Sequence, residues 1–119
     1  MNSCLICLIQ NIIFSEATSK LHPLFDEHVL NSDTFNVSVK PTPPDGGGLA
    51  YYNGPSVDGR RVGAFYLNTQ NLKAQRKYLA TTFTIHEANP GHHLQTSFNK
   101  HSPIPAFLRF FSVITKYIF

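Results

Sequence analysis

The order of hydrophobic and polar positions predicts strands in the first half of the chain and helices in the second. Residues 35–40 alternate apolar and polar side chains, which is the period of a half-buried strand. Prolines and glycines at residues 41–48 end that strand in a flexible loop. A second extended piece begins at Tyr51, and residues 62–68 predict a third strand after a turn. The pattern therefore predicts two or three short strands.

Helical spacing of apolar positions follows the strands. Leu79 and Phe83 fall on one face of a helix predicted over residues 78–89, although the threonines between them weaken its helix propensity. Pro90 lacks a backbone donor and its ring collides with the carbonyl four residues earlier, so the helix must be interrupted before it continues to about residue 100. A last apolar stripe predicts a C-terminal helix and comprises Phe107, Phe110, Phe111, Ile114 and Ile118. The chain is therefore expected to be α+β, with short strands followed by a kinked helix and a C-terminal helix.

Residues 1–23 form an apolar N-terminal segment whose role is left open by the pattern. Its apolar run could belong to a signal peptide, but no positive charge precedes it and Gln10 interrupts it. Cys4 and Cys7 have the Cys-x-x-Cys spacing without a second pair, so we interpret them as two small apolar residues. No stretch reaches the roughly 18 apolar residues of a membrane-spanning helix. The compartment therefore stays open.

Composition fits a folded chain of at most one domain, since 42% of its 119 residues are hydrophobic and 14% are charged. Charge is unevenly distributed: residues 1–59 hold two lysines and six acids, whereas residues 60–119 hold eight Lys or Arg and one acid. The basic side chains are scattered, without a basic run or a nucleic-acid motif, so we expect no nucleic-acid partner. The aromatic C-terminal stripe would also suit a membrane surface, although a core helix is the more ordinary interpretation and no membrane partner is expected.

Residues 86–93 carry three imidazoles and one carboxylate. A histidine beside a glutamate, with another histidine within two helical turns, can supply two nitrogen ligands and a general base to a zinc hydrolase. The usual spacing places the histidines four residues apart on one helix face, but Pro90 occupies that position here. On a straight helix His93 would lie roughly 10 Å along the axis from His86, too far to share a metal ion. Only a distortion at Pro90 could bring His92 or His93 back beside His86, and without one the histidines merely begin the next helix.

The run from His86 to Gln95 resembles the His-Glu-x-x-Pro-Gly-His-x-x-Gln motif of the domain of unknown function 885 family, a branch of the zincin-type, gluzincin-like metallopeptidase superfamily. The similarity covers roughly residues 24–109, which would form a partial metallopeptidase-like domain, and leaves residues 110–119 as an apolar tail outside it. Its upstream segments are Leu24-Phe25-Asp26, Ala50-Tyr51-Tyr52, Asp58-Gly59-Arg60 and Gly63-Ala64-Phe65-Tyr66-Leu67-Asn68.

The resemblance implies roles for the motif residues. His86 and His92 would ligate zinc, and Glu87 would deprotonate the water that attacks the substrate carbonyl. His93 is the reserve candidate for the second ligand. Gln95 could orient a ring as a partner of the ligands or could face solvent.

The resemblance also implies where a substrate would lie. The strand over residues 62–68 would form the sheet edge beside the motif helix, where an extended peptide could align. Nearby side chains could hold a peptide carboxylate or stabilise an oxyanion, without a catalytic role being assigned to any of them: Tyr51, Tyr52, Tyr66, Arg60 and Arg61. The remaining histidines are expected at the surface or in turns: His22, His28 and His101.

A third zinc ligand is missing from the sequence pattern. The resemblance implies a glutamate on a downstream helix in a Glu-Gly-Trp-like motif, but the chain has no Trp and no acid after Glu87. We therefore expect a truncated part of a larger, mainly helical zincin-like domain. Its parent would be a zinc-dependent hydrolase of peptide or related amide bonds, and this chain alone would be inactive. The alternative is a non-catalytic fragment or binding module that retains the motif. Under either interpretation, an exposed apolar C-terminal helix could drive self-association of the chain.

Overall fold

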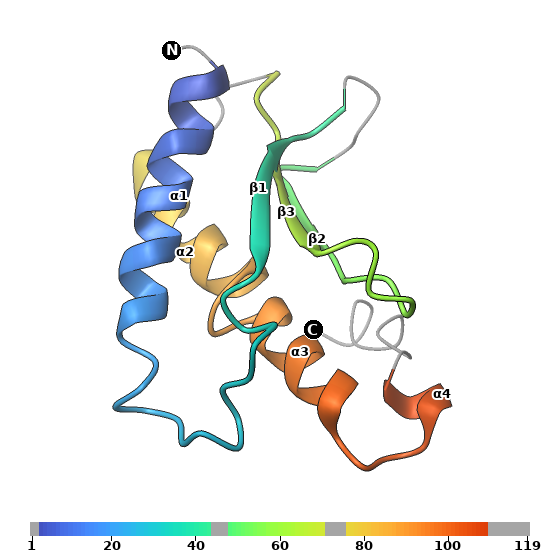
Figure 1. The fold of residues 1–119 in the computed structure, drawn as a ribbon. Helices are drawn as coiled ribbons and strands as arrows, with labels where there is room; N and C mark the ends of the chain where they lie inside the picture. The colour runs from blue at the N-terminus through green and yellow to red at the C-terminus, as the bar shows by residue number, and fades with distance from the viewer. Residues whose placement is uncertain (1–2, 44–47, 71–75, 110–119) are drawn as a thin grey trace.

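The computed structural model describes residues 3–43, 48–70 and 76–109 (Figure 1). Helices and strands both occur, so the α+β prediction is confirmed. In chain order the described elements are α1 (Ser3–Ser19), β1 (Val37–Pro41), β2 (Ala50–Asn53), β3 (Gly63–Leu67), α2 (Lys77–Glu87), α3 (His92–His101) and α4 (Ala106–Arg109).

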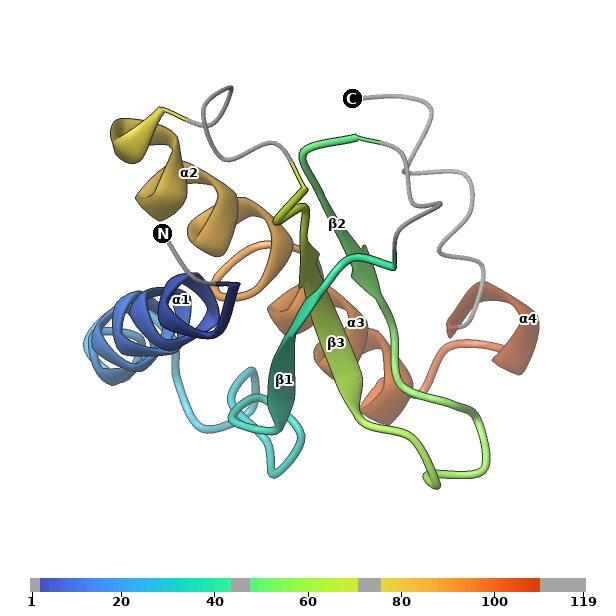
Figure 2. The same cartoon turned by 90° about the horizontal axis from the view of Figure 1, so that it is seen from above.

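The sheet has β3 at its centre, with β1 on one side and β2 on the other (Figure 2). β3 runs parallel to β1 and antiparallel to β2. The prediction that residues 62–68 form the edge beside the motif helix is therefore wrong. β3 takes the central place because four of its five residues are buried, whereas β1 ends in the exposed Lys40 and Pro41, which suit an edge.

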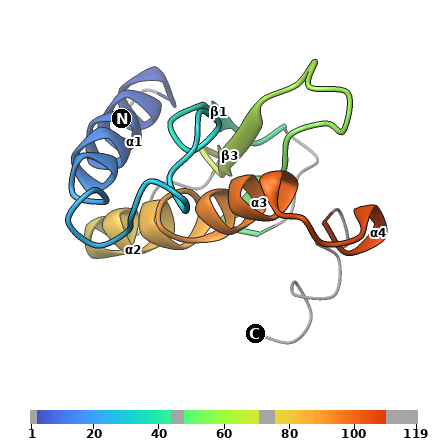
Figure 3. The same cartoon turned by 60° about the horizontal axis from the view of Figure 1, so that its bottom comes forward.

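Helices cover one face of this sheet. α2 and α3 follow one another end to end along it, and α1 packs against both α2 and β1 (Figure 3). The inward face of the sheet presents Tyr52, Phe65 and Leu67, all of which are buried. A second apolar cluster of Leu21, Leu30 and Leu94 joins the segment between α1 and β1 to α3. The start of α3 is thus held between the sheet and this segment.

The apolar N-terminal run lies in α1, and two polar residues of this helix, Gln10 and Thr18, point inward. Gln10 is buried and its side-chain amide hydrogen-bonds the hydroxyl of Thr84 on α2. Thr18, near the end of α1, accepts a hydrogen bond of 3.2 Å from the Asn89 side chain. The helix therefore reaches the motif through polar contacts, although the sequence pattern treats Gln10 as an interruption. Large apolar side chains on its outer face remain exposed: Leu5, Leu8, Ile9 and Ile12.

The predicted C-terminal helix is described only at its beginning. Phe107 lies in α4 and is 69% exposed. The other positions of the predicted stripe, Phe110, Phe111, Ile114 and Ile118, lie outside the described residues. None of the helices within the described ranges has both the length and the apolar character needed to cross a membrane.

Candidate metal centre

The motif folds as two helices joined by a tight turn. α2 ends at Glu87, residues 88–91 form the turn, and α3 begins at His92. The predicted interruption at Pro90 is therefore confirmed. The turn contains a cis peptide bond between Asn89 and Pro90. Across this turn, the first residue of α3 comes to lie beside the last turn of α2.

Gly91 allows the turn to pass close to the end of α2. A Cβ at this position would lie 1.8 Å from the carbonyl oxygen of His86 and 2.4 Å from its carbonyl carbon. These are backbone atoms of a helix and cannot swing aside, so no residue with a side chain fits here. The absence of a side chain at residue 91 is therefore what permits the approach of His92 to His86.

Asn89 anchors the turn to the rest of the protein. Its side chain is fully buried, and its Nδ2 donates to the carbonyl oxygen of Thr34 at 2.8 Å and to Oγ1 of Thr18 at 3.2 Å. The first contact reaches the segment before β1 and the second reaches α1. A buried amide that makes two such bonds fixes the turn at one position.

The turn brings His86, Glu87 and His92 together. One nitrogen or oxygen atom from each side chain lies within 4.8 Å of the others, and within the described residues this is the single such group that could hold a metal ion. The two imidazole rings meet edge to face with centroids 4.8 Å apart, and Nε2 of His92 lies 3.9 Å from Oε2 of Glu87. Atoms that bind one zinc ion tetrahedrally at about 2.1 Å are about 3.4 Å apart, so small side-chain rotations would close the site. His86 is exposed, which leaves the cluster open to solvent.

His93 lies outside the cluster, in the interior. Its Nε2 is 2.7 Å from the carbonyl oxygen of Asp33, which can only accept, so Nε2 carries the hydrogen. Its Nδ1 therefore accepts the hydroxyl hydrogen of Tyr52 at 2.8 Å. Burial lowers the pKa of His93, which favours this neutral form. With both ring nitrogens occupied, the reserve candidate has no lone pair to offer to a metal ion.

Comparison with known proteins identifies the family of the chain. Residues 13–118 match a family described as "Bacterial protein of unknown function (DUF885)". The chain belongs to this family. The matched range contains all residues from His86 to Gln95. It is wider at both ends than residues 24–109, the range over which the sequence analysis found the resemblance. No curated protein gives a match.

A solved structure has a similar fold. It is described as the crystal structure of "the putative lipoprotein from Colwellia psychrerythraea", and it matches with a TM-score of 0.72 and 34% sequence identity. The similarity covers 82% of this chain and 16% of that one. This chain therefore spans only a small part of the length of that lipoprotein.

The tyrosines considered as substrate contacts divide between the two faces of the sheet. The Tyr52 hydroxyl is directed inward to His93, and burial raises its pKa above the ordinary value of 10.0. Tyr51 and Tyr66 form a cross-strand stack with ring centroids 4.7 Å apart. Since neighbouring residues of a strand point to opposite faces, this pair lies on the face away from Tyr52. Tyr52 is therefore the one of the three beside the motif.

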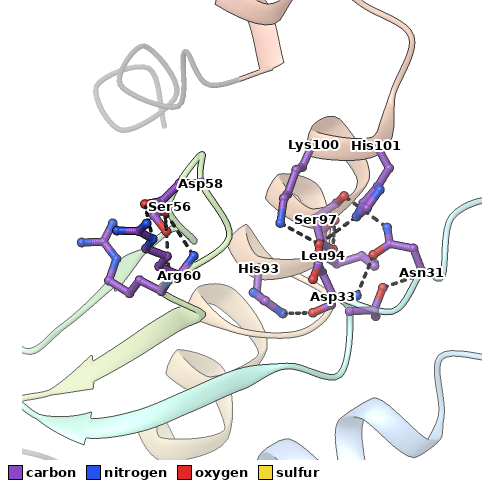
Figure 4. A network of polar contacts seen from close by, with 12 residues as sticks. Asn31, Asp33, Ser56, Asp58, Arg60, His93, Leu94, Ser97, Lys100 and His101 are labelled. Carbon is purple, nitrogen blue, oxygen red and sulfur yellow. Dashed lines mark hydrogen bonds and ion pairs between the residues drawn. The ribbon is translucent and has the colours of Figure 1, made fainter.

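The arginines considered as substrate contacts lie in the loop between β2 and β3. The Arg61 guanidinium donates to the carbonyl oxygen of Gly54 at 3.1 Å, and Nε of Arg60 lies 3.6 Å from the Asp58 carboxylate. Both arginines thus brace their own loop, and Figure 4 shows the Asp58–Arg60 group apart from His93 and α3. Gln95, considered as a partner of a ligand ring, is exposed.

Asp33 contacts the motif helix in a way that the sequence pattern did not predict. Its carboxylate accepts hydrogen bonds from His101 Nε2 at 2.7 Å and from Lys100 Nζ at 3.0 Å, while its carbonyl oxygen holds His93 (Figure 4). Asn31 adds a bond from its Nδ2 to the carbonyl oxygen of Ser97. The segment before β1 is thereby fastened to α3. Its partners on α3 lie at least 60 positions away, so no local pattern could have predicted them.

The remaining histidines lie away from the cluster. His22 stacks on Phe35 with ring centroids 5.8 Å apart, and His28 is exposed. His101 is also exposed, as the sequence predicts, but it is paired with Asp33.

Asp33 should give the fold a measurable sensitivity to acid. The hydrogen bond from His101, assisted by Lys100, lowers the pKa of Asp33 below its ordinary value of 3.8. The ionised carboxylate therefore stabilises the fold above about pH 4, and this contribution is lost as the pH falls through the folded-state pKa. Asp33→Asn should lose about 1 kcal/mol of unfolding free energy near neutral pH and show a smaller further loss in acid. Urea unfolding near pH 6 and pH 3 measures both, and the same pH dependence in variant and wild type would contradict the assignment.

Proposed function

We propose that His86 and His92 bind a zinc ion and that, with Glu87, they form part of a hydrolytic site for peptide or related amide bonds. The observation that carries the proposal is the convergence of two imidazoles and one carboxylate within 4.8 Å across the turn at residues 88–91. Imidazole nitrogens and a carboxylate are donors that zinc accepts in proteins. The range matched to the DUF885 family contains all three residues.

Each residue has a role that follows from its position. A zinc ion bound there would supply a Lewis acid that polarises a carbonyl oxygen and lowers the pKa of water. His86 and His92 would hold it through neutral ring nitrogens. The Glu87 side chain is 13% exposed and adjoins both rings, so its carboxylate would accept the proton of the attacking water and return it to the leaving nitrogen.

Hydrolysis would need one more ligand than the cluster offers. A catalytic zinc is normally held by three protein ligands, with the fourth position left for water or substrate. With Glu87 acting as the base, the described residues supply two ligands. The third would come from outside the described ranges, and without it zinc binding is weak and water is poorly oriented. This shortfall favours, as the second candidate, a non-catalytic zinc-binding module.

The edge of the sheet beside the motif helices would take an extended substrate. That edge is β2, since β3 is central. The backbone N–H of Asn68 donates to the carbonyl oxygen of Leu49, and in an antiparallel ladder every second residue is hydrogen-bonded to the same partner strand. Tyr51 and Asn53 therefore bond to β3, whereas the backbone N–H and C=O groups of Ala50 and Tyr52 point to the open side. A peptide could add there as a further strand, next to His92.

Zinc competition against a chromogenic chelator tests the metal site in the full chain. His86→Ala and His92→Ala should each weaken zinc binding by at least about 10-fold, since loss of a direct ligand exceeds the effect of losing a ligand's partner. Glu87→Gln should keep its affinity, because the carboxylate acts as a base. His28→Ala is the matched control, since it removes an exposed histidine outside the cluster. Unchanged affinity in both ligand variants would refute the site.

A peptide-cleavage assay separates the two candidates. We expect no turnover from this chain alone, because two ligands do not fix the metal and its water. Turnover that Glu87→Gln abolishes would instead mean that a third ligand is supplied from outside the described residues or by a second copy, and would exclude the non-catalytic module.

A further inference from the structure

Tyr52 touches the motif in two ways. Its ring lies 16° from parallel to the His92 ring, with centroids 6.3 Å apart, and its hydroxyl donates to Nδ1 of His93 at 2.8 Å. We propose that Tyr52 is a positioning residue: through His93 it fixes the first turn of α3, and thereby holds His92 beside His86. This inference rests on the zinc site proposed above.

His93 transmits the constraint because it is the next residue after His92. Its fully buried ring bridges Tyr52 on β2 and the carbonyl oxygen of Asp33 before β1. The ring cannot shift without breaking one buried and one part-buried hydrogen bond, and the Cα atoms of neighbouring residues are always about 3.8 Å apart. The start of α3 is therefore fixed in position and in rotation about its axis, which sets the direction of the His92 side chain.

Gly63 on β3 makes room for this arrangement. A Cβ at residue 63 would lie 2.6 Å from the Tyr52 hydroxyl and 2.7 Å from Nδ1 of His93. The hydrogen bond between the two side chains thus lies directly over the backbone of the central strand, where any side chain would push them apart. The same contact is therefore supported from β2, β3 and α3.

The hydroxyl can be separated from the ring experimentally. Tyr52→Phe keeps the ring beside His92 and removes the group that holds His93. Tyr66→Phe is the matched control, because it removes a hydroxyl from the neighbouring strand on the opposite face of the sheet. Gly63→Ala is a second variant, which displaces the pair and leaves the chemistry of both rings unchanged.

The measurements combine a metal-free readout with a metal-bound one. In the zinc-free full chain, the NMR chemical shifts of the His92 and His93 imidazoles should change in both Tyr52→Phe and Gly63→Ala. Zinc affinity should fall about 10-fold in both, in the range found when the partner of a ligand is removed, and the visible absorption spectrum of the cobalt-substituted chain should change. Tyr66→Phe should match the wild type in all three, and urea unfolding checks that each variant is folded.

Each outcome decides the question. His92 resonances and a cobalt spectrum equal to those of the wild type in Tyr52→Phe would overturn the positioning role, even if that variant were less stable. A wild-type chain that binds no zinc would overturn the proposed function instead. In that case, a change of the His92 chemical shifts in both Tyr52→Phe and Gly63→Ala would still establish that Tyr52 positions His92. Unchanged His92 chemical shifts would reject that role.

Discussion

Gly91→Ala should disrupt the motif turn and cost the protein about 3 to 5 kcal/mol of unfolding free energy. The new Cβ would lie 1.8 Å from the His86 carbonyl oxygen and 2.5 Å from that of Ile85. Both atoms belong to the last turn of α2, so relief requires the turn to move away from the helix. His92 would then lose its place beside His86, and zinc affinity should fall together with stability.

Gly54→Ala provides the control for this change. Its Cβ would meet Cγ2 of Thr96 at 3.4 Å, which is an ordinary contact. The same chemical substitution should therefore change the unfolding free energy by no more than about 1 kcal/mol. Urea unfolding and chelator competition on both variants measure the difference. A Gly91→Ala protein as stable as Gly54→Ala would contradict the geometry of the turn.

Substitution of the two adjacent histidines should have opposite effects on stability and on zinc affinity. His93→Ala removes a fully buried ring, takes away the acceptor of the Tyr52 hydroxyl and one of the two donors to the Asp33 carbonyl oxygen, and opens a cavity. These losses should cost about 3 to 5 kcal/mol of unfolding free energy. His92→Ala removes a side chain that is 28% exposed, so its stability should change by about 1 kcal/mol or less while its zinc affinity is lost.

Two assays on each variant test this contrast. Urea unfolding should separate His93→Ala from the wild type and leave His92→Ala close to it. Chelator competition, run where His93→Ala remains folded, should detect residual zinc binding in that variant and little in His92→Ala. If His92→Ala were the less stable variant and His93→Ala the weaker zinc binder, the assignment of the two rings would be reversed.

Local sequence patterns predicted where helices and strands begin and end, whereas contacts between distant residues decide which side chains face the interior. Pro90 carries its own steric consequence, so the break between α2 and α3 could be predicted from the sequence. Spacing alone could not choose His92 over His93, and only the family resemblance favoured His92, because the interior position of His93 depends on partners that lie 41 and 60 residues away. Gln10 was misleading for the same reason: a polar residue in an apolar run reads as an interruption until its partner on α2 is known.

The place of β3 illustrates a second limit. Alternation and turn residues locate a strand along the chain, but they do not say which neighbour will pair with each of its sides. β1 reaches β3 across more than 20 intervening residues, and that pairing converts the expected edge into the centre. The open edge consequently lies on β2, which the sequence marked only as an extended piece beginning at Tyr51.

The polar contacts of the motif also bear on the order in which the chain folds. Asn89 joins residues 71 and 55 positions earlier, and Thr84 joins a partner 74 positions earlier. Contacts between such distant positions form slowly, because the intervening loops must close first. His86 and His92 are near neighbours in sequence, yet the turn that orients them is complete only when α1 and the segment before β1 have docked. Binding of the proposed zinc ion should therefore mark the end of folding and not its nucleation.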